Sequence, residues 1–323
     1  MAANGACGDA ATEMTLVDGW CCDNNGDVSD AKLTHIDRLP VKPIPRLAMA
    51  VDDIVEPSVA DAIYTYSTAL GKPWGVYLTL HGGAGDSPAE RLQAGDKAMP
   101  EEEVEIARGT VDQFWLQRLS PLLAPIIDQV HGFEVWVLVG AEGSKCDYHL
   151  DFAESYRLDD NHIATPIYSS CLHPSPLNVS EESRMEGGDF ACNLEGLGHY
   201  KKHGHKYRMS SPEEAREDWE TSASWMKMRY KYRRGVVFDG SLPHLSTPVT
   251  RLPAGMKRLV VGINVYDHGT SALVARLGSA GVSQRTDCGV SETGEKVEDC
   301  PVHSQKQRED HMYTMLREDL FGE

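Results

Sequence analysis

The sequence predicts an α+β fold in which a β-sandwich or barrel follows a helical N-terminal part. Before residue 130 two segments have the spacing of amphipathic helices, whereas the chain after residue 130 is a succession of short apolar runs typical of strands. With 323 residues, 41% of them hydrophobic and 25% charged, the chain can bury a sizeable core. We expect one domain at residues 31–270 whose β core begins at about 130, after a flexible arm at 1–30 and before a C-terminal extension at 271–323.

The helices are predicted from periodicity and from start signals. Apolar residues recur at helical spacing between residues 52 and 70, and again from Glu101, where an acidic first turn opens a helical region that extends to 130. Ser211 followed by Pro212 predicts a further helix start, because Ser is a favoured cap and Pro fits the first helical position. The extension ends in a helix-like segment at 304–320.

The strands are predicted from apolar or alternating runs that end at turn residues. They lie at residues 74–80, 133–139, 162–172, 190–192, 235–238 and 258–266.

Charge and composition restrict the partners. The formal net charge is −18, and the basic clusters are short, so nucleic acid is a disfavoured substrate. No apolar run approaches the roughly 18 residues of a membrane span, and the first residues lack the pattern of a secretory signal. We therefore expect a cytoplasmic protein that does not bind membranes and whose eight cysteines are reduced thiols.

Residues 148–152 contain a histidine and an aspartate two positions apart, His149 and Asp151. Side chains alternate along a strand, so His149 and Asp151 are expected on one face. A third ligand is available in His244, which follows a strand-like run. Two imidazoles and one carboxylate on one face of a metal ion leave three positions open, as in non-haem Fe(II) oxygenases.

The last predicted strand begins with Arg258 and has two different faces. The apolar face, which should pack on helices, consists of Leu259, Val261, Ile263 and Val265. The other face is small or polar, as a ligand cavity requires, and consists of Arg258, Val260, Gly262 and Asn264. A cavity arginine is costly unless an anion meets it, and a dicarboxylate bound bidentately would be such an anion. Arg251, in a loop, and Lys257, on the apolar side, compete less well for this role.

With His149-x-Asp151, His244 and Arg258 in this order and strands between them, residues 130–268 resemble the Fe(II)- and 2-oxoglutarate-dependent dioxygenases, in the prolyl-hydroxylase-like HxD…H…R pattern. The resemblance implies a double-stranded β-helix (jelly-roll, cupin-like) core flanked by the N-terminal helices. It implies that the two histidines and the aspartate hold Fe(II), and that Arg258 binds the distal carboxylate of 2-oxoglutarate. No catalytic residue beyond the metal ligands is implied.

The chain departs from the family at Val260, where many members carry a Ser that hydrogen-bonds the cosubstrate. Tyr148, Tyr168 or Tyr230 could supply the missing hydrogen bond, and the sequence does not choose among them. Asn264, on the same strand face as the arginine, is a further candidate for cosubstrate binding.

The resemblance implies a reaction that consumes 2-oxoglutarate and O2, releases succinate and CO2, and hydroxylates a C–H bond of a small molecule or a peptide side chain. Related halogenases carry Gly or Ala in place of Asp151, so the carboxylate favours hydroxylation or an outcome derived from it, such as demethylation, desaturation or ring closure. Two alternatives stay open: a cupin-type isomerase or cosubstrate-free dioxygenase that does not need Arg258, and a binding module that keeps only the fold.

A histidine-rich segment, with His199, His203 and His205 beside Lys201 and Lys202, has two interpretations. It is either a mobile basic loop over the cavity mouth, which we prefer, or a second metal site.

Overall fold

The structure is a computed structural model that describes residues 14–16, 36–37, 47–81, 87–94, 99–152, 163–207 and 210–268. The predicted C-terminal extension, with its helix at 304–320, lies outside these residues, as does most of the predicted N-terminal arm. Within that arm, Met14–Leu16 form a short strand, β1, at the edge of the main sheet.

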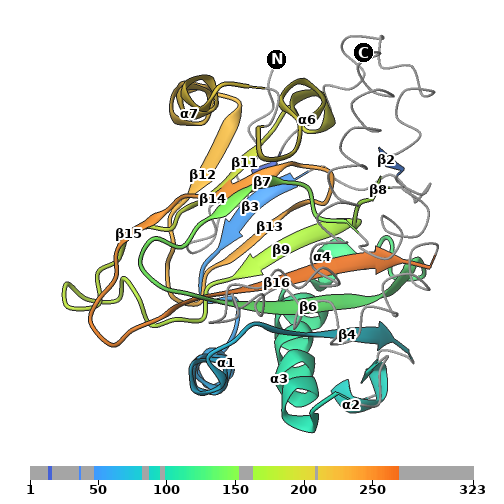
Figure 1. The fold of residues 1–323 in the computed structure, drawn as a ribbon. Coiled ribbons are helices and arrows are strands. Elements are labelled where there is room, and N and C mark those ends of the chain that lie inside the picture. Colours follow the sequence, from blue (N-terminus) through green and yellow to red (C-terminus); the bar gives the residue numbers. More distant parts are fainter. Residues whose placement is uncertain are drawn as a thin grey trace, which may run out of the picture.

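A large antiparallel sheet, here called the major sheet, forms the centre of the molecule (Figure 1). In spatial order, its strands within the described residues are β1, β3 (Leu47–Val51), β13 (Gly235–Asp239), β9 (Tyr168–Leu172), β16 (Arg258–Asp267), β6 (Val130–Gly140), β4 (Trp74–Leu80) and β5 (Leu92–Ala94). Neighbours in this order are mostly distant in sequence, so the sheet is held by long-range pairing.

A second antiparallel sheet, the minor sheet, covers part of the major one. In spatial order it contains β12 (Trp225–Met228), β11 (Phe190–Asn193), β14 (His244–Ser246) and β7 (Cys146–His149). The two sheets share a buried cluster in which the rings of Phe190 and Phe238 lie 5.0 Å apart. Two smaller pairs join β10 (Glu186–Gly187) to β15 (Val249–Arg251), and β2 (Ile36–Asp37) to β8 (Ile163–Ala164).

Helices cover the outer faces of both sheets (Figure 1). The main core lies between the major sheet and a group of N-terminal helices, α1 (Pro57–Leu70), α3 (Glu101–Val111), the π-helix η2 (Asp112–Arg118) and α4 (Ser120–Leu123). The outer face of the minor sheet packs against α6 (Leu197–His203), η3 (His205–Tyr207) and α7 (Pro212–Thr221). A short helix, α2 (Pro88–Arg91), precedes β5. Among the described residues, none of these helices is both long enough and apolar enough to cross a membrane.

The predicted α+β class and most predicted elements are confirmed. The strand at 74–80 has the predicted bounds, and α7 begins with the predicted cap, because the Ser211 side chain accepts from the backbone of Glu214 while the Glu214 side chain accepts from the backbone of Ser211. The helical region predicted at 101–130 is wrong at its end, where β6 already begins at Val130. Within this region, the π-helix η2 buries both Phe114 and Trp115. On an α-helix, these two consecutive side chains would point in directions about 100° apart.

Strand β16 has the two faces that its sequence predicts. Its apolar face belongs to the same core cluster as the N-terminal helices, through Leu259, Val261, Ile263 and Val265. On the other face, Gly262 pairs in register with Trp136 of β6. A Cβ at position 262 would lie 1.9 Å from Cε2 of this indole, so only glycine allows the ring to lie across the strand.

We predict that Gly262→Ala lowers the free energy of unfolding by about 1–3 kcal/mol, because the added methyl group must displace the Trp136 ring or separate the strands. Urea unfolding followed by circular dichroism measures the change. Gly109→Ala is the matched control, since nothing lies within 4 Å of a Cβ at this helical position. It should stabilise the protein by about 0.5–1 kcal/mol. Equal stability of Gly262→Ala and the unsubstituted chain would contradict this packing.

Candidate metal centre and cosubstrate cavity

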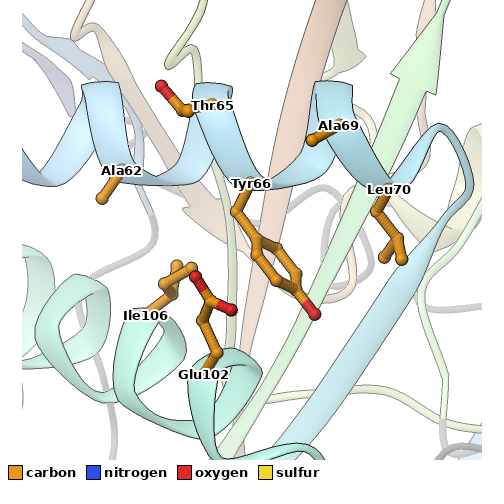
Figure 2. A pocket seen from close by; sticks show the side chains of 7 residues that line it. All are labelled: Ala62, Thr65, Tyr66, Ala69, Leu70, Glu102 and Ile106. Carbon is orange, nitrogen blue, oxygen red and sulfur yellow. The ribbon is translucent and has the colours of Figure 1, made fainter.

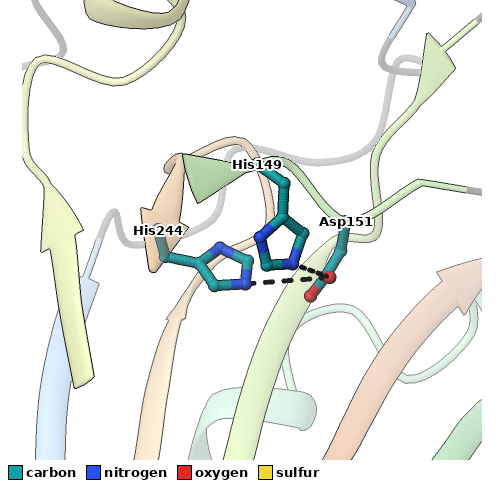
Figure 3. A group of neighbouring side chains, drawn as sticks. All are labelled: His149, Asp151 and His244. Carbon is teal, nitrogen blue, oxygen red and sulfur yellow. Dashed lines mark ion pairs between the residues drawn. The ribbon is translucent and has the colours of Figure 1, made fainter. Parts of the chain in front are cut away.

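Three predicted ligands converge where the minor sheet ends (Figure 3). Strands β7 and β14 pair antiparallel, with His149 directly opposite His244. Asp151 follows two residues after β7 ends, so it stands just beyond the strand that we expected to carry it. Its Oδ1 lies 3.4 Å from Nε2 of His149 and 3.7 Å from Nε2 of His244. One ligand atom from each residue therefore lies within 4.8 Å of the others, a spacing that one metal ion can bridge.

The backbone orients both imidazoles. Nδ1 of His149 lies 2.7 Å from the carbonyl oxygen of Asp147, and Nδ1 of His244 lies 3.2 Å from that of Leu242. A carbonyl only accepts, so each Nδ1 carries the proton and donates it. This leaves each Nε2, which faces Asp151, as the atom that can bind a metal. Ligating histidines are held in the same way by outer hydrogen bonds in metalloproteins.

The charges of the three groups suit a divalent cation. Burial raises the pKa of Asp151, but the two neighbouring imidazoles outweigh it and lower this pKa to about 2. Burial and the charge of His149 lower the pKa of His244 to about 4. Burial also opposes protonation of His149, yet Cys146 and Asp151 raise its pKa well above the usual 6.5. The low pKa of Asp151 keeps its carboxylate ionised, and the low pKa of His244 keeps its imidazole neutral, the forms in which both groups bind a cation.

A cavity of about 200 Å³ opens beside the three ligands, between the two sheets. It is lined by Pro73, Trp136, Leu138, Val139, Gly140, Ser144, Lys145, Cys146, His149, Cys171, His173, Phe190, His244, Leu245, Ser246, Arg258 and Val260. Most of these side chains are apolar, and the polar ones lie near the metal ligands and near Arg258, as expected of a small-ligand site.

Arg258 is a buried cation at the wall of this cavity, with 7% of its surface exposed. One of its terminal nitrogens donates to the carbonyl of Gly188 at 2.9 Å and to Oγ of Ser246 at 3.2 Å. Within the described part of the chain, its Nε has no hydrogen-bond partner, and neither does the buried Oγ of Ser144 on the same cavity wall. Among the described residues, no carboxylate forms an ion pair with Arg258. A buried guanidinium without a counterion is costly, so the wall fits a bound carboxylate.

Of the residues predicted to bind the cosubstrate, only Arg258 lines the cavity. The hydroxyl of Tyr148 bonds to His199 on the other face of β7, and the Tyr168 ring stacks on Trp115 in the main core. Asn264 donates to Glu134 at 3.2 Å.

Tyr230, the remaining alternative, donates to the carbonyl of Leu259 and accepts from the backbone of Ser175. We assign none of these four side chains to the cosubstrate.

The two competitors of Arg258 lie outside the cavity. Arg251 is exposed and lies 3.3 Å from Glu186, and Lys257 is exposed just before β16 begins. Of the three basic residues considered as the cosubstrate anchor, only Arg258 is buried and lines the cavity.

Sequence reasoning missed several cavity residues. Ser246 follows His244 by two positions, so strand alternation could have identified it. Ser144 comes from the turn before β7, where alternation gives no guidance, and Cys146 is the first residue of that strand. Gly188 has φ +72°, and a Cβ there would lie 3.0 Å from Nε of Arg258. The sequence indicated a turn at Gly188, but it did not indicate the contact of this residue with Arg258.

A larger hollow of about 580 Å³ lies in the helical layer, between α1 and α3 (Figure 2). It is lined by Ala62, Thr65, Tyr66, Ala69, Leu70, Glu102 and Ile106. This lining has no histidine or cysteine and only one carboxylate, so it offers no metal site and no pair of groups for acid and base chemistry.

The histidine-rich segment is not the mobile basic loop that we preferred. Residues 197–203 form helix α6, and His199 and His203 are only 2% and 6% exposed. The interpretation as a mobile loop is therefore wrong for His199 and His203.

No protein-family model matches the chain, and no curated protein matches it. Among solved structures, a prolyl-4-hydroxylase from Pseudomonas putida is 12% identical, with a TM-score of 0.40 over 68% of this chain and 85% of that chain. Prolyl 4-hydroxylase from Phytophthora capsici is 14% identical, with a TM-score of 0.41 over 85% of each chain. HygX from Streptomyces hygroscopicus, with nickel and 2-oxoglutarate bound, is 12% identical, with a TM-score of 0.39 over 68% of this chain and 82% of that chain. Within the described residues, the structure brings together His149, Asp151 and His244, the three metal ligands that the sequence resemblance implies.

Proposed function

We propose that the protein is a non-haem Fe(II)- and 2-oxoglutarate-dependent oxygenase that hydroxylates a C–H bond. The observation that carries the proposal is the convergence of two histidines and an aspartate beside a cavity whose wall holds Arg258, a buried cation with no ion pair to any described carboxylate. The first group suits Fe(II), because two imidazoles and one carboxylate leave positions open for cosubstrate and O2. Arg258 suits the distal carboxylate of a dicarboxylic acid such as 2-oxoglutarate.

Each residue has a defined task in this proposal. His149, Asp151 and His244 hold the iron, and the carbonyls of Asp147 and Leu242 keep both imidazoles in the ligating orientation. Arg258 anchors the distal carboxylate of 2-oxoglutarate, and the free Oγ of Ser144 offers a second donor on the same wall. Bound iron would supply the oxidation of 2-oxoglutarate to succinate and CO2 coupled to attack on the substrate.

We also infer that the major and minor sheets form a double-stranded β-helix, and that residues 31–270 make up a single oxygenase domain. The substrate is proposed to be a small molecule or a peptide side chain that reaches the iron from the open side of the cavity, where Leu138 is 39% exposed. The net charge of −18 favours a cationic substrate over a nucleic acid.

We predict that His149→Ala and His244→Ala each weaken Fe(II) binding by about 100-fold or more and abolish succinate formation, because each removes a direct ligand, whereas losing an outer hydrogen bond alone costs about 10–100-fold. Metal content after dialysis and succinate release from 2-oxoglutarate measure the two effects. His131→Gln is the control, since His131 bonds to Tyr77 outside the cavity. Succinate formation by either alanine variant at the rate of the unsubstituted chain would rule out the ligand assignment.

Arg258→Ala should leave Fe(II) affinity unchanged but raise the 2-oxoglutarate concentration for half-maximal turnover by about 100-fold. This corresponds to about 2.7 kcal/mol, a typical contribution of a hydrogen-bonded ion pair. Arg251→Ala is the matched control, because it removes an exposed guanidinium from the adjacent strand β15. If Arg258→Ala had no effect while metal-dependent activity persisted without 2-oxoglutarate, the chain would instead be a cupin-type metalloenzyme.

A further inference from the structure

A second group of potential metal ligands lies on the outer side of the minor sheet. His199 and His203 are four residues apart on α6 and therefore project from the same face of the helix. Asp218 comes from the facing helix α7. One ligand atom from each of these three residues lies within 4.8 Å of the others. None of them lines the cavity described above.

His199 is held between two partners. Its Nε2 lies 2.8 Å from Oδ2 of Asp218, and its Nδ1 lies 2.8 Å from the hydroxyl of Tyr148. Asp218 Oδ2 also accepts from Nε1 of Trp225 at 2.8 Å. These hydrogen bonds fix the carboxylate and the first imidazole in place.

Hydrogen bonding within the cluster does not explain why the ring of His203 is buried. It is only 6% exposed, and its ring centre lies 4.2 Å from that of His199. Its Nδ1 lies 2.5 Å from Oγ of Ser210, but its buried Nε2 has no hydrogen-bond partner among the residues that the structure describes. Burying an imidazole nitrogen that has no hydrogen-bond partner is unfavourable, because the nitrogen loses its hydrogen bond to water. A cation bound at this nitrogen would remove that cost.

We propose that His199, His203 and Asp218 bind a divalent cation of the zinc type through the two Nε2 atoms and a carboxylate oxygen. Two imidazoles and one carboxylate are typical ligands of Zn²⁺, with a water molecule or another donor as the fourth ligand. A ligating histidine needs an acceptor for the proton on its other ring nitrogen. Nδ1 of each of these histidines has a hydroxyl oxygen as its partner, and a hydroxyl oxygen can accept. The side chain of Asp218 is 23% exposed, which gives the ion a route from solvent.

The protons balance without an added base. In the metal-free protein, Nε2 of His199 donates to Asp218, and Nδ1 accepts from Tyr148. When the cation takes Nε2, the proton resides on Nδ1, which donates to the oxygen of Tyr148 instead. Both imidazoles stay neutral, and the carboxylate stays ionised. The cation would therefore join α6 to α7 and fix Tyr148, which directly precedes His149 on β7.

The test uses the full-length double variant His149→Ala/His244→Ala, in which the candidate iron centre is removed. After treatment with a chelator, Zn²⁺ is added back, unbound ion is removed, and zinc is counted by mass spectrometry, with thermal unfolding as a second readout. We expect one zinc ion per chain and a higher Tm when it is bound. His203→Gln or Asp218→Asn in the same background should abolish both effects while circular dichroism stays unchanged. A folded double variant that retains no zinc would overturn the proposal, as would retention that neither substitution affects.

A finer comparison tests the orientation of His203. Ser210→Ala removes the hydroxyl partner of its Nδ1 and should weaken zinc binding by about 10-fold, the lower end of such effects. Ser211→Ala is the matched control, because the neighbouring hydroxyl caps α7 and does not contact His203. Both serine substitutions are made in the His149→Ala/His244→Ala background, and zinc affinity should be the same in the Ser211→Ala protein and in the parent double variant. Equal losses in both serine variants, or in neither, would overturn binding through Nε2 of His203. Because every arm lacks His149 and His244, the results are independent of the oxygenase proposal.

Discussion

The candidate iron centre depends on the pairing of two short strands, β7 and β14. Their register sets His149 opposite His244, although the two residues are far apart in sequence. Facing residues of an antiparallel pair have Cβ atoms about 4.5–5.5 Å apart, so strand pairing alone brings the imidazoles close. Asp151 then needs only the short segment after β7 to reach them. The geometry of the two histidines is therefore a property of the sheet, on which hydrogen bonds to backbone carbonyls hold both imidazoles.

The second constraint is the unpaired charge of Arg258. Burying a guanidinium without a counterion costs free energy, and the fold offsets only part of that cost through the carbonyl of Gly188, Oγ of Ser246 and the Tyr230 ring 5.6 Å away. Gly188 also allows the close approach, because a side chain there would meet the arginine. Arg258 also lines the cavity next to the ligand cluster. A carboxylate ligand and a metal are thus favoured at neighbouring positions by independent features.

Much of this could be predicted because it follows from local rules. Alternation of period two separated the two faces of β16, and cap chemistry placed the start of α7. The order of His149, Asp151, His244 and Arg258 then indicated which strands must meet. Contacts that join distant segments had no such signal. The polar, lysine-rich sequence of α6 suggested an exposed loop, and only its packing against Asp218 and the minor sheet explains why His199 and His203 are buried.

Strand β7 connects the two ligand clusters through the same alternation. Tyr148 and His149 are consecutive, so one side chain turns toward α6 and the other toward the cavity. Tyr148 is clamped there by His199 and by the ring of Tyr207, whose centre lies 4.5 Å away. A strand held so firmly on its outer face has little freedom on its inner face, where small displacements of His149 would alter the metal geometry. The polar cluster around Asp218 therefore supports the opposite side of the strand that carries the first ligand.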